Sequence, residues 1–199
     1  MDYFIELLFS GLTRGAIYAL IALGYTMVYG IIGLINFAHG EIYMIGAFTA
    51  LIVATVLSLW GLPLFAVLAL AALAAAVWAA AYGCTIERLA YRPLRTAPRL
   101  SPLISAIGMS IFLQNWVALG QGARDMAVPS LIPGALRFGS DGGFEVYVPY
   151  SRILIIAVAV VLMIALTLYI QHSRMGRASR ACSQDMHMAN LLGIDTNRV

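Results

Sequence analysis

Residues 64–86 read LFAVLALAALAAAVWAAAYGCTI, a run without any charged side chain. A helix rises about 1.5 Å per residue, so about 20 apolar residues are enough to cross the hydrocarbon core of a bilayer. The rest of the chain is similar: 62% of its 199 residues are hydrophobic, 11% are charged, and its mean hydropathy is +0.89. This composition excludes an ordinary water-soluble domain and predicts helices whose exterior faces lipid.

Four more apolar segments flank this run, at residues 11–30, 42–59, 103–119 and 152–170. We therefore expect an all-α, polytopic membrane helix bundle of about five transmembrane helices, which form a single transmembrane domain over residues 1–199. The longest connector, 120–150, mixes charged residues with glycine and proline, as surface loops do. The chain stops in a polar stretch without a capping signature, so we expect the domain to be incomplete at its C-terminus.

The basic residues predict how the helices are oriented. The chain contains no lysine, and seven of its twelve arginines form two groups beside the apolar segments: Arg88, Arg92, Arg95 and Arg99, then Arg174, Arg177 and Arg180. Two crossings separate the groups, so both lie on one side, which the positive-inside rule makes the cytoplasmic side. Residues 120–150 are then external. Arginines beside apolar runs favour a membrane surface over a nucleic-acid partner.

A polar break separates the first two spans. Asn36, His39 and Glu41 lie there, and His39 and Glu41 are the only residues between Ala16 and Trp60 that titrate near neutral pH or carry a charge. Glycines at positions 30, 33 and 40 interrupt the helical pattern around them. One interpretation is a broken helix that lines a translocation path or acts as a hinge, because irregular backbone at membrane depth is tolerated only at a cavity or inside protein. The other is a tight cytoplasmic hairpin whose polar side chains satisfy helix ends. The cost of an intramembrane charge, about 2.5 to 3.5 kcal/mol or more, favours a functional role.

Small residues recur every four positions in the third span, at Ala71, Ala75, Ala79 and Gly83. Such a ridge lets two helix backbones approach closely in lipid. It predicts a packed bundle and indicates nothing about a solute.

The segment 174–195 is predicted to form one short amphipathic helix at the membrane surface, with Gly193 just after its end. Arginines and other polar residues lie on one face, and small and apolar residues on another. The segment could be a membrane-surface anchor or a docking helix for a cytoplasmic partner. We favour docking, because the bulky aromatic face of an anchor is missing.

Nothing in the sequence indicates catalysis. A chain without lysine cannot form the phosphate-binding loop of an ATPase, and the three histidines lack metal-ligand spacing. Neither a serine nor a cysteine is paired with a base at motif spacing. We expect a non-enzymatic protein without a metal or cofactor.

Several segments together resemble the permease family of branched-chain amino-acid ABC transporters. They are YALIALGYTMVYGIIG at 18–33, INFAHGE at 35–41, IERLAYRP at 86–93, LISAIGMS at 103–110 and the stretch 173–194. The resemblance covers essentially the whole chain, but the family continues through further membrane helices beyond this point.

The resemblance implies an importer in a bacterial inner membrane that carries leucine, isoleucine or valine. Its partners would be a second permease subunit, two cytoplasmic ATP-binding subunits and a periplasmic amino-acid-binding protein. The matching positions that would couple the permease to the ATPases are Arg177, Ala181, Asp185, Ala189 and Gly193.

Three alternatives stay open. Related permeases for urea or short amides share the Asn-x-x-His-Gly pattern. A secondary transporter or channel could use His39 and Glu41 as a proton or ion relay. A structural subunit that does not transport is the third alternative.

Overall fold

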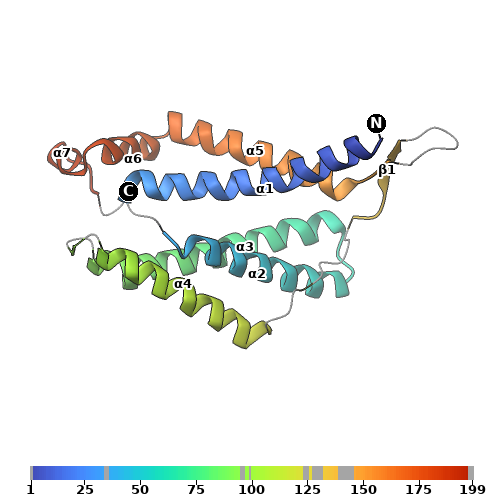
Figure 1. The fold of residues 1–199 in the computed structure, drawn as a ribbon, viewed down its shortest axis with the longest axis horizontal. Helices are drawn as coiled ribbons and strands as arrows, with labels where there is room; N and C mark the ends of the chain where they lie inside the picture. Colours follow the sequence, from blue (N-terminus) through green and yellow to red (C-terminus); the bar gives the residue numbers. More distant parts are fainter. Residues whose placement is uncertain are drawn as a thin grey trace. The chain divides into compact units, whose positions relative to one another are not determined.

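The computed structural model describes residues 2–33, 36–94, 97–98, 100–122, 126, 132–138 and 146–196. Figure 1 shows the elements in chain order. They are α1 (Asp2–Ile32), α2 (His39–Leu59), α3 (Leu64–Ile86), the π-helix η1 (Glu87–Tyr91), the 3-10 helix η2 (Arg92–Leu94), α4 (Leu100–Gln121), β1 (Ala135–Phe138), β2 (Val146–Pro149), α5 (Tyr150–His172), α6 (Arg174–Gln184) and α7 (Met186–Leu191).

Five of the described helices are long and apolar enough to cross a membrane, which confirms the predicted all-α bundle with five spans. Each predicted span lies inside an observed helix; α3 has the predicted bounds, and the other four helices are longer. The first candidate span is Tyr3–Gly30 rather than 11–30, and α2 begins at His39 rather than at residue 42. His39 and Glu41 therefore belong to the first turn of α2 and not to a connector.

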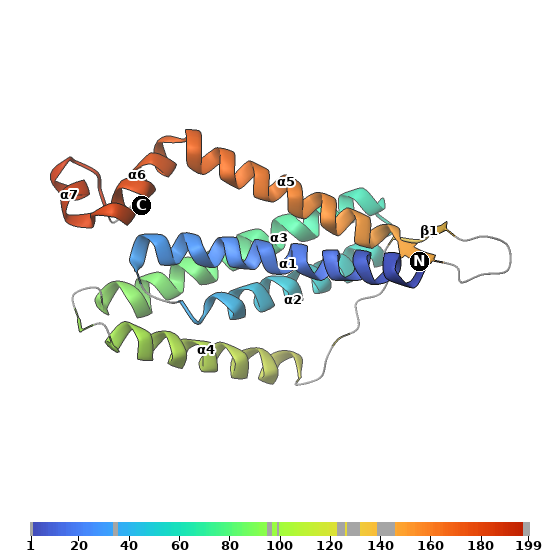
Figure 2. The same cartoon turned by 45° about the horizontal axis from the view of Figure 1, so that its top comes forward.

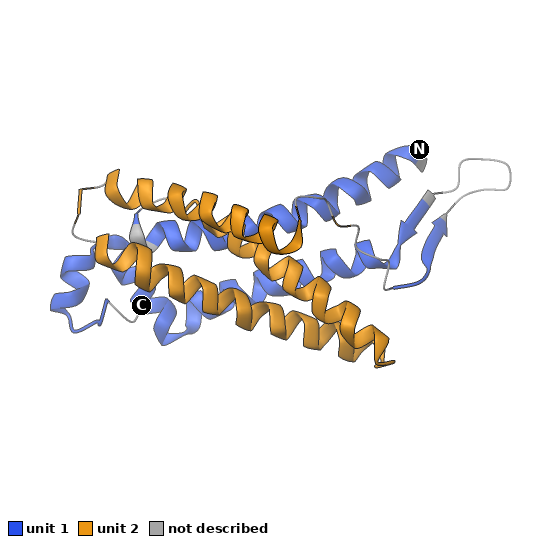
Figure 3. Ribbon diagram, turned by 90° about the horizontal axis from the view of Figure 1, so that it is seen from below, with its two compact units in different colours: residues 1–33, 132–199 blue, residues 34–131 orange. Residues whose placement is uncertain are grey.

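The chain divides into two compact units (Figure 3). Unit 1 holds residues 1–33 and 132–199, and unit 2 holds residues 34–131. The expectation of a single transmembrane domain over the whole chain stays a prediction.

In unit 1, α1 and α5 lie side by side and run in the same direction (Figure 1). Strands β1 and β2 form an antiparallel hairpin directly before α5, paired from Ala135 with Pro149 to Phe138 with Val146. Val148 of this hairpin is fully buried, and β2 contacts α1. The connector 120–150, expected to be a loop, thus contains a hairpin; residues 123–125, 127–131 and 139–145 lie outside the described part.

In unit 2, α2 and α3 pack closely along the predicted ridge of small residues. A methyl group placed on Gly46 would lie 3.7 Å from Ala79 Cβ and 3.9 Å from the Ala75 carbonyl oxygen. Ala71 is buried with Ala54 and Val67 at the other end of the pair. The close approach of two backbones that the ridge predicts is therefore confirmed.

The segment 174–195 differs from the prediction, because it forms two helices instead of one. Asp185 interrupts it with an extended backbone (φ −154°, ψ 105°), and its Oδ1 accepts hydrogen bonds from the amides of His187 and Met188, both at 2.9 Å. Aspartate is favoured at such an N-cap over a helix interior, because its short side chain competes for backbone amides. Gly193 ends α7 with φ +84°, as expected for a residue just after a helix.

Candidate functional site

The predicted polar break is tied to the end of α3. Asn36 Oδ1 accepts a hydrogen bond from the Ala38 amide at 3.1 Å and a second from the Tyr91 hydroxyl at 2.7 Å. The Asn36 carbonyl accepts from the His39 amide at 3.1 Å, and His39 is the first residue of α2. Asn36 thus shapes the start of α2 and joins it to a tyrosine far along the chain.

Tyr91 is the last residue of a π-helix that continues α3. A π turn holds one residue more than an α turn, so it rotates the side chains that follow it, and such turns are frequent at functional sites. Ala90 in this turn packs against Ala38 in a buried cluster with Ile86. The π-helix therefore lies directly against the break before α2.

Glu41 is bound to α4. Its Oε1 accepts hydrogen bonds from the Ser110 hydroxyl at 3.0 Å and from Gln114 Nε2 at 2.7 Å. Ser110 and Gln114 are four residues apart, so they lie on one face of α4. Two spans are thus joined through one half-buried carboxylate.

The same contact shows where α2 begins along α4. Helices α2 and α4 run in the same direction, because α3 returns between them, and Figure 2 shows α2 beginning beside the middle of α4. Ser110 is about 15 Å from the start of α4 at 1.5 Å per residue. Glu41 therefore lies about half way along a neighbouring span. Whether the break is a broken helix or a tight hairpin stays a prediction.

A second arrangement of polar groups surrounds the joint between α5 and α6. The last carbonyl groups of α5 accept from two arginines: Arg177 donates to His172 at 3.1 Å, and Arg180 donates to Ile170 and, at 3.4 Å, to Gln171. Arginine near a helix C-terminus satisfies carbonyls that have no partner within the helix. These two arginines therefore hold α6 against the end of α5.

Two further residues make this joint tight. Ser173 Oγ accepts from the Gly176 amide at 2.8 Å and caps α6. A Cβ atom on Gly176 would lie 2.6 Å from Ile170 Cα, so only glycine fits there. The joint is consequently closed by backbone contact as well as by side chains.

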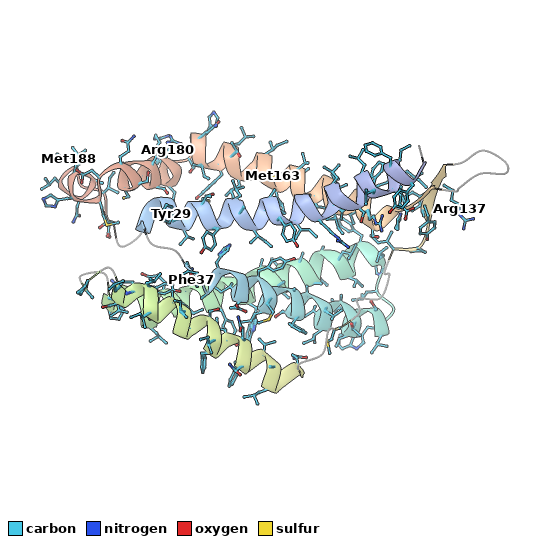
Figure 4. The ribbon with its side chains drawn as sticks, in the orientation of Figure 1. Tyr29, Phe37, Arg137, Met163, Arg180 and Met188 are labelled. Atoms are coloured by element: carbon cyan, nitrogen blue, oxygen red, sulfur yellow. The ribbon has the colours of Figure 1, made fainter. Side chains whose placement is uncertain are left out.

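The other predicted residues of this segment have different environments. Ala189 is buried, Ala181 is half-buried, and Asp185 and Gly193 are exposed. Next to them, α7 and the residue after it present large apolar side chains to the outside: Met186, Met188 (labelled in Figure 4), Leu191 and Leu192.

Comparison with known proteins identifies the family of this chain. The family model for the permease component of branched-chain amino acid transport systems matches residues 7–199. The chain belongs to this family. It is 54% identical over 198 residues to the high-affinity branched-chain amino acid transport system permease protein BraD of Pseudomonas aeruginosa, and 52% identical to LivH of Escherichia coli K12 and of Salmonella typhimurium. No solved structure matches it.

Each of these alignments covers 99% of this chain and 64% of the relative, so the chain spans less than two thirds of the length of the curated permeases that it matches. With its five candidate spans, this member of the permease family is a multi-pass membrane protein.

Sequence reasoning missed three residues of the site: Tyr91, Ser110 and Gln114. Two of them carried a signal, because Ser110 and Gln114 are polar residues at helical spacing inside an apolar span. Nothing in the sequence indicated Tyr91, because its position beside Asn36 depends on the π turn. The Asn36 and Glu41 side chains bond to different partners, Tyr91 and the pair on α4, and the backbone of Asn36 bonds to that of His39. Their role in translocation stays a prediction.

Proposed function

We propose that this chain is the membrane-spanning permease part of an ABC importer for branched-chain amino acids. The observation that carries the proposal is the 54% identity, over 99% of the chain, with a permease named for high-affinity branched-chain amino acid transport. The five apolar helices are the spans of a translocation pathway, and ATP is hydrolysed by separate subunits.

The arginines support an orientation in a bacterial inner membrane. The group after α3 and the group after α5 are separated by α4 and α5, so both face the cytosol under the positive-inside rule. Two ATP-binding subunits bind on that side. The hairpin of β1 and β2 precedes α5 and thus faces the periplasm, where a binding protein delivers the solute. A second permease subunit lies beside this one in the membrane and completes the pathway.

The α6 and α7 helices suit a coupling element. Leu191 and Leu192 are 70% and 75% exposed, which leaves an apolar surface for an ATP-binding subunit. The capped joint between α5 and α6 is rigid. A displacement of α7 by an ATP-binding subunit therefore also displaces α5, which is a membrane span. Movement of the ATPases then biases the bundle between states that open to opposite sides.

The test is uptake by purified components in liposomes. The permease, as its gene encodes it, is reconstituted with its partner permease, its ATPases and the binding protein, and [3H]leucine uptake is measured with and without ATP. We expect ATP-dependent uptake that unlabelled isoleucine and valine inhibit. An ATPase subunit with its phosphate-binding lysine replaced is the control and should abolish uptake.

The same assay separates the alternatives. ATP-dependent uptake of [14C]urea or [14C]acetamide without leucine uptake would show that the solute is urea or a short amide and not a branched-chain amino acid. Leucine uptake driven by a pH gradient without ATPases would show that the protein is a secondary transporter and not part of an ABC importer.

A further inference from the structure

We infer that Glu41, Ser110 and Gln114 form the site that binds the ammonium group of the transported solute. The inference rests on the proposed function, because it takes an amino acid as the solute. It assigns Ser110 and Gln114, which were not among the predicted site residues, to solute binding.

The first argument is the state of the Glu41 carboxylate. Both hydrogen bonds that it accepts end on Oε1 and come from neutral donors, at 3.0 Å from Ser110 and 2.7 Å from Gln114. Among the described residues, nothing donates to Oε2 and no arginine or histidine forms an ion pair with this carboxylate. An acid placed within a span is expensive unless it meets an opposite charge, so the free oxygen is suited to a cation from outside the chain.

The donor set identifies which cation fits. An ammonium group has three N–H donors and needs acceptors rather than a full coordination sphere. Besides Glu41 Oε2, the site offers the amide oxygen of Gln114 and one lone pair of Ser110 Oγ, which also accepts a weak hydrogen bond from Gln114 Nε2 at 3.5 Å. Calcium takes six to eight oxygen ligands, and no group of three His, Cys, Asp or Glu able to hold a metal occurs in the described part of the chain. The site therefore favours an ammonium over a metal ion.

The surroundings fit an amine that carries an aliphatic chain. Ile45 and Leu113 are buried in the cluster beside the polar trio, and Ile42 and Met109 are packed against this cluster. Apolar side chains next to a single charged group are the usual composition of a site for a small amphiphilic molecule. A branched aliphatic side chain can pack here while its ammonium group meets Glu41.

The decisive variant is Glu41→Gln in the complete reconstituted transporter. Glutamine keeps an oxygen that can accept from Ser110 and Gln114 but carries no charge. We expect leucine uptake at least tenfold below wild type, while ATP hydrolysis stimulated by the loaded binding protein continues. Ser110→Ala should lower uptake severalfold. Ser58→Ala on α2 should leave uptake unchanged, because within the described part of the chain the Ser58 hydroxyl bonds only to the carbonyl of Ala54 in its own helix.

A second measurement separates binding from a structural role. Dicyclohexylcarbodiimide modifies carboxylates within membranes, and peptide mass spectrometry reads modification of Glu41. We expect 3-methylbutylamine, which is leucine without its carboxylate, to protect Glu41, and 4-methylpentanoate, which lacks the ammonium group, to give no protection. Equal protection by the acid, or wild-type uptake by Glu41→Gln, overturns the inference. A wild-type transporter without ATP-dependent leucine uptake contradicts the proposed function instead.

Discussion

At the scale of single residues, the hydrogen bond between Tyr91 and Asn36 makes a measurable prediction. Tyr91→Phe removes the donor at 2.7 Å and leaves Asn36 Oδ1 with the Ala38 amide alone. A hydrogen bond of this kind contributes about 1 kcal/mol to stability, so we expect a lower midpoint of thermal unfolding of the purified protein in detergent, followed by tryptophan fluorescence.

Tyr82→Phe is the matched control for this residue. Tyr82 packs against the same buried cluster, and its hydroxyl makes no hydrogen bond among the described residues. The two variants should therefore differ in unfolding midpoint. Equal midpoints would show that the Tyr91 hydroxyl does not hold the break before α2.

Among single residues, the sequence identified the charged and polar members of the site more readily than their partners. Asn36 and Glu41 were visible because charge and amide groups are rare in such an apolar stretch. Their partners were not, because Tyr91 is 55 residues from Asn36 and Ser110 is 69 residues from Glu41 along the chain. Periodicity places a residue on a face of its own helix but does not say which helix that face meets.

At the scale of elements, the joint between α5 and α6 depends on Gly176. Gly176→Ala places a Cβ atom against the backbone of Ile170, so α6 must swing away and lose the bonds from Arg177 and Arg180. We expect uptake to fall severalfold while the ATPases still hydrolyse ATP. Trypsin should also cleave faster at these two arginines, as measured by mass spectrometry.

Gly108→Ala in α4 is the control for this substitution, because a Cβ atom there has nothing within 4 Å. It should leave both uptake and the cleavage pattern as in the wild type. Normal uptake by Gly176→Ala would contradict a rigid joint between α5 and α6.

Elements were predictable where composition alone determines them. The five spans follow from long runs of apolar residues, and the C-terminal glycine of α7 follows from its position. The division at Asp185 was readable in principle, since aspartate prefers helix starts, but helical periodicity across the segment suggested a continuous helix. The π turn after α3 could not be read, because a shift in backbone hydrogen bonding depends on what the helix packs against.

At the scale of the whole molecule, the orientation can be measured directly. We expect Arg92→Cys and Gln184→Cys, in a background with Cys84 and Cys182 replaced by serine, to react with an impermeant maleimide only in inside-out vesicles. Tyr147→Cys on β2 should react from the periplasmic side in spheroplasts. Positions 92 and 184 labelled from opposite sides would refute the proposed topology.

The staggered start of α2 also has an electrical consequence. A full crossing of the membrane by one elementary charge is worth about 2.3 kcal/mol per 100 mV, and a site within a span experiences the fraction of that voltage that corresponds to its depth. A monovalent amine that reaches Glu41 from outside would then bind more tightly at an inside-negative potential than without a potential. A zwitterionic amino acid carries no net charge, so its uptake should be nearly indifferent to the potential.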